Sequence, residues 1–403
     1  AAGRAGASQK AGDRAVKYGA LIIGGGAAGL IAAVSLARRN HRVAVLEAQG
    51  RVGRKLLATG NGRCNLTNVR AKPEDYFGDR ALIEPALRAF PPSEVLEFFA
   101  ELGVPSRVDE EGRAYPMSNQ AASVLDALRL AFAEAGGEEI ADFRVASISK
   151  GLVADAGDGR RFRGNAVLAA TGGLAAANLG AADAPFLAAL GHAFTKRSPA
   201  LSPLVTEPIL ALKGLRAHVK LTLDGRAEVG EILFTEYGVS GIAAMQLARF
   251  ARPGAALSID FSAGAAIDLA SRARALPERR MEDFLNGVVP KRIGQVVAKA
   301  AGVSLSTRAR ELSAREMDEL SNALTGFQLP VKGAKGFEHA QVTAGGLTSS
   351  DFDPETLESR RVPGLFCAGE LLDADGPCGG YNLQWAWASG RLAARSIDER
   401  LRQ

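Results

Sequence analysis

The stretch 18–47 constrains the fold more than any other part of this chain. An apolar run over Ala20 to Ile23 leads into a GxGxxG pattern, and small residues suited to a helix follow over Ala27 to Ala37. A second apolar run, Val43 to Leu46, ends on Glu47. This order predicts a βαβ unit with an acidic residue at the end of its second strand, as in dinucleotide-binding folds.

Each glycine of the pattern has a physical role at a nucleotide site. Gly24 allows the tight strand-to-helix turn, Gly26 lets the backbone approach a pyrophosphate, and Gly29 lets the helix pack closely on the sheet. The helix N-terminus then faces the phosphate charge, and Glu47 can accept hydrogen bonds from both ribose hydroxyls. The alternative is a tight turn without a ligand. The strand, helix and terminal acid together favour nucleotide binding.

Two other readings of the N-terminal region are less favoured. The apolar stretch Leu21 to Leu36 is about 16 residues long, below the ~20 needed to span a bilayer, so we expect no membrane span. The polar tail Ala1 to Lys17 has no apolar core, so it predicts a disordered segment rather than a secretory signal. Three cysteines without CxxC spacing fit the reducing cytoplasm, and neither they nor the four histidines indicate a metal site.

A chain of 403 residues is too long for a single core, so more than one domain is expected. The expected helices are 80–90, 93–102 with Ser93 as N-cap, 121–135 and 382–401. The expected strands are 142–154, 161–170 and 365–368, with shorter ones at 204–207, 219–223, 231–234 and 256–261. A helical stretch is expected over 265–324. This order predicts a Rossmann-type α/β domain (18–190 and 337–403) interrupted by a β domain (191–264 and 325–336) that carries a helical subdomain (265–324).

The net charge of +5 is unevenly distributed along the chain. Between Gly191 and Gly336 there are 20 Lys and Arg against 14 Asp and Glu. This asymmetry hints at an anionic partner for the middle section, although solvated helix faces that favour arginine are a slightly better explanation.

Two glycine-rich segments carry further ligand chemistry. The loop Gly50 to Asn68 contains Arg54, Lys55 and Arg63, whose charges suit a pyrophosphate and the ring system attached to it. Near the C-terminus, AGE is followed by GGYN, and a helix that begins there would aim its N-terminal amides at negative charge. A reduced flavin has such charge near N1 and O2, so this segment favours FAD over NAD. The alternative for the loop is a solvated basic segment.

The segments GRKLLATGNGRCNLTN, VTAGGL and GLFCAGELLDADGPCGGYNLQWAWASG closely resemble the BaiN/RdsA family of FAD-dependent oxidoreductases. LFTEYGVSG and KRSPALSPL resemble that family's middle-domain motifs, and the resemblance covers nearly everything from Tyr18 onward. It implies a Rossmann-type FAD-binding domain interrupted by a β-barrel-like domain with a helical subdomain. One departure is Cys378, where the family motif has threonine, and it places a thiol near the expected flavin.

The resemblance also implies a set of cofactor contacts. They fall on Gly24, Gly26, Ala28, Gly29, Glu47, Arg54, Lys55, Arg63, Asn65, Val145, Thr171, Gly172, Gly369, Glu370, Gly379, Asn382 and Leu383.

The family resemblance further implies reduction of an activated C=C bond, with hydride transfer from flavin N5 and a proton from a general acid. NAD(P)H would serve as a transient reductant. The first candidate for the acid is Cys64, followed by Cys378 and Tyr381, although packing is an alternative role for each. The expected substrate is uridine in large-subunit ribosomal RNA, which the basic middle section would help to bind. A steroid-like enone and a flavin-binding sensor without turnover remain alternatives.

Overall fold

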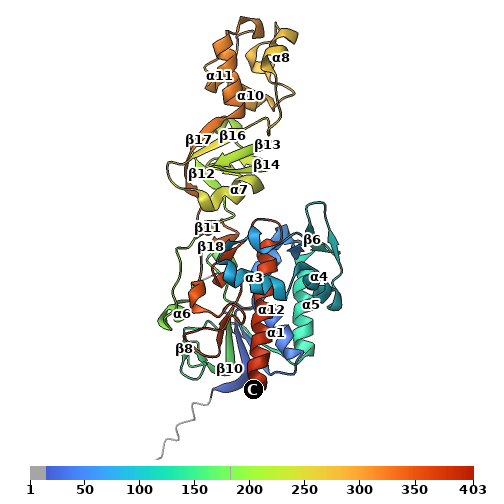
Figure 1. Ribbon diagram of the computed structural model, residues 1–403, viewed down its shortest axis with the longest axis vertical. Coiled ribbons are helices and arrows are strands. Elements are labelled where there is room, and N and C mark those ends of the chain that lie inside the picture. Colours follow the sequence, from blue (N-terminus) through green and yellow to red (C-terminus); the bar gives the residue numbers. More distant parts are fainter. Residues whose placement is uncertain (1–14, 182) are drawn as a thin grey trace, which may run out of the picture.

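The computed structural model describes residues 15–181 and 183–403. Figure 1 shows them as three parts stacked along the long axis: a Rossmann-type α/β part, a barrel and a helical end. Most of the expected N-terminal tail lies outside the described residues. The predicted tail, Ala1 to Lys17, overlaps the first strand, because β1 begins at Val16.

The central sheet contains the predicted βαβ unit. β1 (Val16–Ile23) pairs in parallel with β2 (Val43–Leu46) on one side and with β10 (Arg161–Ala169) on the other. The strand order is β7-β2-β1-β10-β9-β8, and β19 also pairs with β10. The remaining strands are β7 (Glu138–Ile140), β8 (Ser147–Ser149), β9 (Val153–Asp155) and β19 (Leu365–Cys367). The first and last thirds of the chain therefore build one sheet.

Helices cover this sheet and complete its core. α1 (Ala27–Ala37) is buried from Ala28 onward and packs against α12 (Tyr381–Arg402), the long C-terminal helix (Figure 1). Small side chains permit this close packing, since a Cβ on Gly390 would collide with the backbone of Ala28. No helix among residues 15–181 and 183–403 is both long and apolar enough to cross a bilayer.

Three further helices lie where the sequence predicts them. They are α3 (Arg80–Ala89), α4 (Pro92–Glu101) and α5 (Ala121–Glu134). The predicted N-cap at Ser93 is wrong, because α4 begins one residue earlier with Pro91 at the N-cap position. Proline is well suited to the first helical position, where its missing N–H is not needed.

The segment expected to be a loop between the second strand and residue 70 contains regular structure. α2 (Arg54–Ala58) is followed by a 3₁₀ turn and by β3 (Thr67–Asn68). β3 joins a small sheet with β6 (Arg113–Pro116) and β5 (Ser106–Val108). The many glycines of this segment hide α2 in the sequence. Its N-cap is itself a glycine, Gly53, in the left-handed conformation.

A closed six-stranded barrel interrupts the Rossmann part, as the family resemblance implies. Its order is β12-β15-β14-β13-β16-β17. Side chains of β13 alternate between core and solvent, which is the pattern of a strand with one buried face. The strands are β12 (Leu204–Thr206), β13 (Arg216–Leu223), β14 (Arg226–Phe234), β15 (Gly238–Ser240), β16 (Ala256–Asp260) and β17 (Phe327–Ala334).

Helices between β16 and β17 form the far end of the molecule (Figure 1). They are α8 (Leu269–Ala275), α9 (Met281–Phe284), α10 (Lys291–Ala300) and α11 (Ala314–Thr325). One hydrophobic core runs through the barrel and these helices, while a separate core fills the Rossmann part. We propose that these two cores, rather than three, define the folding units, and the residue limits given above remain a prediction.

Two short pairings connect the barrel to the sheet below it. β11 (Ser198–Ala200) pairs antiparallel with β18 (Val342–Ala344), so the outgoing and returning chains run side by side. α7 (Ile242–Leu247) packs on β14 at the end of the barrel that faces the Rossmann part (Figure 1). The junction between the two parts therefore involves α7 and the loops above the sheet.

Candidate functional site

The turn between β1 and α1 has the geometry that its glycines require. Gly24 adopts a φ of +101°, and a Cβ there would lie 2.5 Å from the carbonyl oxygen of Ala170. A Cβ on Gly29 would overlap the carbonyl oxygen of Gly24, whereas a Cβ on Gly26 would meet nothing within 4 Å. Gly24 and Gly29 are therefore needed for the fold itself. Gly26 leaves open space at the N-terminus of α1, where a ligand can approach.

The acid at the end of β2 is held by two backbone amides. Glu47 accepts hydrogen bonds from the N–H of Gly25 at 2.9 Å and of Gln49 at 2.8 Å, one to each carboxylate oxygen. A carboxylate offers about four acceptor positions, so both oxygens can still receive ribose hydroxyls. Gln49 in turn accepts from Arg54 at 2.7 Å, which brings the start of α2 to the same edge.

An ion pair joins the two glycine-rich segments across the chain. Lys55 Nζ lies 2.6 Å from Glu370 Oε2, and Glu370 Oε1 accepts the N–H of Thr343 at 2.9 Å. The neighbouring Gly369 adopts a φ of +75°, and a Cβ there would lie 3.0 Å from that of Ala28. The structure therefore brings α1, α2 and the segment after β19 together at one edge of the sheet.

Two polar side chains of the predicted set lack partners. Within the described residues, the buried atoms Asn65 Oδ1 and Thr171 Oγ1 have no hydrogen-bond partner. A buried polar atom without a partner is costly, so each marks a position where a ligand atom would be stabilising. Gly172, next to Thr171, has a φ of +76° and open space where its Cβ would be. These observations fit the polar groups of a dinucleotide.

The long helix α12 begins beside this region with an open N-terminus. Gly380 is its left-handed N-cap, and no described side chain caps its first amides, which belong to Tyr381, Asn382 and Leu383. Such a helix end favours negative charge. The side chain of Asn382 is already engaged, because its amide donates to the carbonyl of Gly376 at 2.8 Å. Asn382 and Leu383 would therefore contact a ligand through their backbone.

The remaining predicted contacts lie around this edge with varied environments. Arg63 donates to the carbonyl of Gly60 at 3.1 Å, and its guanidinium lies 4.9 Å from the ring centre of Tyr115. Val145 is almost fully buried, and the nearby Phe143 N–H donates to the carbonyl of Glu47 at 2.8 Å. The side chain of Arg113 lies 3.6 Å from where a Cβ on Gly379 would be. Their contact with a ligand remains a prediction.

The three candidates for the general acid differ in environment. Cys64 is fully buried, and burial raises the pKa of its thiol to about 12. Cys378 is partly exposed, with a thiol pKa raised by burial, and its N–H donates to Gln246 Oε1 at 2.9 Å. Burial also raises the pKa of Tyr381. Cys64 lies in a packing position, whereas Cys378 adjoins the junction with the barrel.

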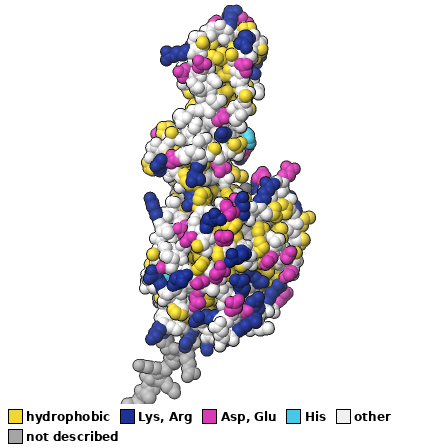
Figure 2. All heavy atoms as spheres, viewed as in Figure 1, with side chains coloured by type: hydrophobic (Ala, Val, Ile, Leu, Met, Phe, Trp, Pro, Cys, Tyr) yellow, Lys and Arg dark blue, Asp and Glu magenta, His cyan; other side chains and the backbone are white. Residues whose placement is uncertain are grey.

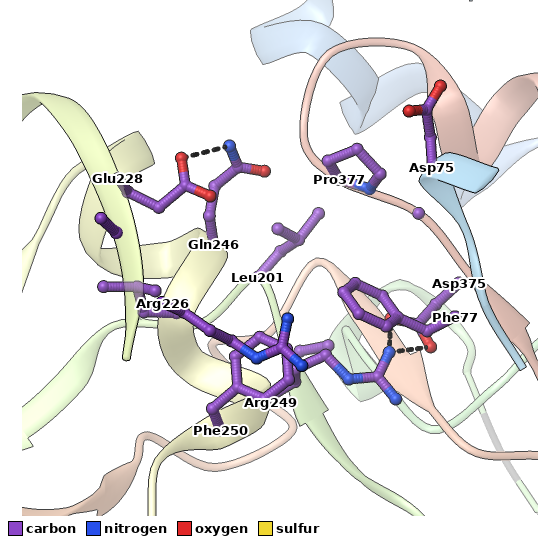
Figure 3. A pocket seen from close by; sticks show the side chains of 14 residues that line it. Asp75, Phe77, Leu201, Arg226, Glu228, Gln246, Arg249, Phe250, Asp375 and Pro377 are labelled. Atoms are coloured by element: carbon purple, nitrogen blue, oxygen red, sulfur yellow. Dashed lines mark hydrogen bonds and ion pairs between the residues drawn. The ribbon is translucent and has the colours of Figure 1, made fainter. Parts of the chain in front are cut away.

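A pocket of about 370 Å³ lies at that junction, and no sequence pattern predicts it. It combines apolar and charged side chains from both parts of the molecule, and Figure 3 shows how they surround the opening. The residues are Asp75, Phe77, Ala200, Leu201, Arg226, Ala227, Glu228, Gln246, Leu247, Arg249, Phe250, Asp375, Gly376 and Pro377. No local pattern predicts the pocket, because its lining segments are distant in sequence. The one sequence signal for a site here was Asp375, an acid shortly before the glycine pair Gly379 and Gly380.

An ion pair closes one side of the pocket. Arg249 Nη1 lies 2.6 Å from both oxygens of Asp375, whose side chain is 3% exposed. Burial raises the pKa of Asp375 to about 6, although Arg249 opposes this shift. The Arg249 guanidinium also lies 4.0 Å from the ring centre of Phe77. Pro377 is part of the pocket wall, and Cys378 follows it directly in the sequence. Since α12 begins at Tyr381, the pocket adjoins the open N-terminus of this helix.

Comparison with known proteins identifies the class of protein to which this chain belongs. Residues 18–396 match the model of the HI0933-like protein Rossmann domain. The chain is 36% identical to the 3-dehydro-bile acid delta(4,6)-reductase of Clostridium scindens, over 94% of this chain and 98% of that protein. It is 29% identical to the ribosomal RNA dihydrouridine synthase of Escherichia coli, again over 94% and 98%. These matches place the protein among the flavin-dependent oxidoreductases.

The chain belongs to the HI0933-like family, which confirms the resemblance found in the sequence. A solved structure, the 3-ketosteroid delta1-dehydrogenase of Sterolibacterium denitrificans, has the same fold. Its TM-score is 0.53 at 13% identity, and the match covers 95% of this chain and 100% of that one.

Proposed function

We propose that this protein holds FAD at the carboxyl edge of the central sheet and reduces a conjugated C=C bond, that of uridine in large-subunit ribosomal RNA. Glu47 would bind the adenosine ribose, and the open N-termini of α1 and α12 would face the pyrophosphate and the flavin ring. The unpartnered Asn65 and Thr171 side chains support this assignment most directly, because each needs a ligand atom. The cytoplasm, where ribosomal RNA is found, is the proposed location.

Reduced FAD, when bound, supplies a hydride at N5 and is itself oxidised. Uracil accepts the hydride at C6 and a proton at C5, which gives dihydrouridine. The chain must supply that proton, and we assign this role to Cys378 or Tyr381 ahead of Cys64. Cys378 follows directly on the pocket wall, whereas the Cys64 thiol has no exposed surface. NAD(P)H is the proposed reductant that restores the flavin.

The observation that carries the choice of substrate is the charge within the pocket. Its wall combines Arg226, Arg249, Glu228 and Asp375 with the rings of Phe77 and Phe250. A uracil ring offers hydrogen-bond donors and acceptors to such groups and an aromatic face to stack. A steroid skeleton offers few polar groups, so it would desolvate Arg226 and the second carboxylate oxygen of Glu228 without giving either a partner, which is costly. The pocket therefore favours a polar heterocycle.

The basic composition of the insert gives weaker support for RNA. On the face shown in Figure 2, Lys and Arg side chains are interspersed with Asp and Glu rather than gathered in one patch.

The second candidate for the substrate is a small steroid-like enone. It is favoured by the 36% identity to a bile acid reductase over nearly the whole chain.

Mass spectrometry of ribosomal RNA from cells that lack this gene tests the proposal. Loss of a dihydrouridine from the large-subunit RNA, restored by the gene on a plasmid, would support it. Unchanged dihydrouridine would contradict the choice of uridine. Retention of FAD by the purified protein tests the cofactor separately.

A further inference from the structure

A chain of hydrogen bonds crosses the junction and ends in the pocket. The N–H of Cys378 donates to Gln246 Oε1 at 2.9 Å, and Gln246 Nε2 donates to Glu228 Oε2 at 3.2 Å. Cys378 lies at the proposed flavin edge, Gln246 on α7 and Glu228 on β14. Figure 3 shows Glu228 and Gln246 side by side on the barrel wall, opposite Pro377.

These two hydrogen bonds fix which way the Gln246 amide points. The opposite orientation would place the NH₂ group against the N–H of Cys378 and the amide oxygen against the carboxylate of Glu228. Both contacts would be repulsive, so a single orientation is stable. The Gln246 side chain is therefore a fixed element of the wall rather than an adaptable one.

Two hydrogen-bonding positions remain free on this wall. Within the described residues the Glu228 carboxylate has one hydrogen-bond partner, Gln246, so its Oε1 can still accept a hydrogen bond. The second hydrogen on Gln246 Nε2 can still be donated. The wall thus presents an acceptor beside a donor in a partly buried setting, where an unmatched partner is costly.

We propose that Glu228 and Gln246 read the imide edge of a uracil-type ring, which rests on the function proposed above. Glu228 accepts the N3–H of the ring, and Gln246 donates to the adjacent carbonyl oxygen. These two groups set the specificity of the pocket and do not take part in hydride transfer. A carbocyclic enone offers only the carbonyl, so it would leave Glu228 Oε1 desolvated without a donor.

The side chain of Arg226 supplies the complementary contact for a nucleotide. Its guanidinium lies 4.1 Å from the ring centre of Phe250, and among the described residues it forms no ion pair. An arginine held over an aromatic ring keeps its donors available for a phosphate. The pocket therefore takes a pyrimidine nucleotide with its phosphate toward Arg226 and its imide edge toward Glu228.

The test compares two short adenosine-rich oligonucleotides, one with a central uridine and one with N3-methyluridine. Binding to the FAD-loaded protein is measured by fluorescence anisotropy. The methyl group removes the N3–H and blocks Glu228, so the protein should bind uridine roughly 10- to 100-fold more tightly, as expected for a hydrogen bond to a charged group.

The variant Glu228→Gln sharpens the test without changing size. Its amide oxygen must face the Gln246 NH₂, so its own NH₂ would point toward the N3–H of the ring. The ratio of the two affinities should then fall from 10- to 100-fold to about one. Glu231→Gln is the matched control, since Glu231 lies on the same strand but pairs with Arg216 at the surface. It should keep the full preference. FAD content and the thermal midpoint confirm that each variant is folded.

Equal binding of both oligonucleotides by the wild type would overturn the proposal, as would an unchanged preference in Glu228→Gln. If dihydrouridine is lost from cells without the gene while the preference is absent, the proposed function stands and the imide reading fails. If dihydrouridine is unchanged but the preference is present and depends on Glu228, the imide reading stands and the RNA substrate fails.

Discussion

The nucleotide edge of the sheet and the pocket at the junction are built in opposite ways. The edge draws its turn, helix end and acid from one continuous stretch, in which Glu47 accepts the N–H of Gly25 at 2.9 Å. The pocket draws its walls from five distant segments, and its closing pair joins Arg249 to Asp375 across 126 positions. Local backbone geometry determines the first, and domain packing determines the second. Changes at the edge should therefore affect the fold, and changes at the pocket should affect selectivity and pH response.

The largest effect is expected from the glycines of the edge. In Gly29→Ala the new Cβ would overlap the carbonyl oxygen of Gly24, so the unfolding free energy should fall by about 3 kcal/mol or more. In Gly26→Ala the Cβ meets open space, so the FAD-free protein should change by less than about 1 kcal/mol while FAD binding is lost. Urea unfolding of the FAD-free proteins and FAD titration measure the two effects. Equal destabilisation by both changes would contradict this separation.

The next effect concerns the pH response of the pocket. Burial raises the pKa of Asp375 from 3.8 to about 6, so the folded carboxyl holds its proton more tightly than the unfolded one. The resulting stabilisation is present below the unfolded value and is lost as the pH rises through the folded value. Between about pH 4 and pH 7 the wild type should lose about 3 kcal/mol relative to Asp375→Asn.

Urea unfolding across that range measures the difference. Asp224→Asn, at an exposed ion pair with Arg252, is the control and should follow the wild type. Arg249→Met should move the loss to higher pH, because Arg249 lowers the pKa of Asp375. Parallel curves for the wild type and Asp375→Asn would show that the pocket is not coupled to pH.

The same contrast explains what the sequence could predict. The βαβ unit, the inserted β domain and α12 follow from periodicity and from glycine patterns, because neighbouring residues create those signals. The closure of the inserted strands into a barrel was implied by the family resemblance. Asn65 and Thr171 came from the family resemblance, and each has a buried side-chain oxygen without a partner among the described residues. Glu370 belongs to the AGE segment, which the sequence itself singles out, and it pairs with Lys55. Glu228, Gln246 and Arg249 could not be found, since their meaning depends on how the barrel sits on the sheet. The N-cap of α4 was missed because proline at the first turn competes with serine as a start signal.

A smaller effect is expected at the ion pair of the edge. Lys55 and Glu370 are 31% and 19% exposed, so Lys55→Met should change the unfolding free energy of the FAD-free protein by less than about 1 kcal/mol. FAD affinity should fall about tenfold, since a cation beside the pyrophosphate is lost. Lys220→Met, on an exposed position of β13, should change neither quantity. Unaltered FAD affinity in Lys55→Met would remove this lysine from the proposed site.

The smallest effect on function is expected at Cys64, which the sequence placed first among the candidates for the general acid. Its side chain is fully buried and its thiol pKa is raised to about 12, so the thiol neither meets the pocket nor ionises readily. Cys64→Ala should cost about 1 kcal/mol of unfolding free energy, as expected for a small buried group. Flavin oxidation by the substrate, followed in a stopped-flow instrument, should keep its rate within about twofold, because a group that supplies the proton contributes roughly 10² or more. A rate loss of that size in Cys64→Ala, with FAD binding intact, would mean that the edge rather than the pocket delivers the proton. The division between the two regions would then fail at its central point.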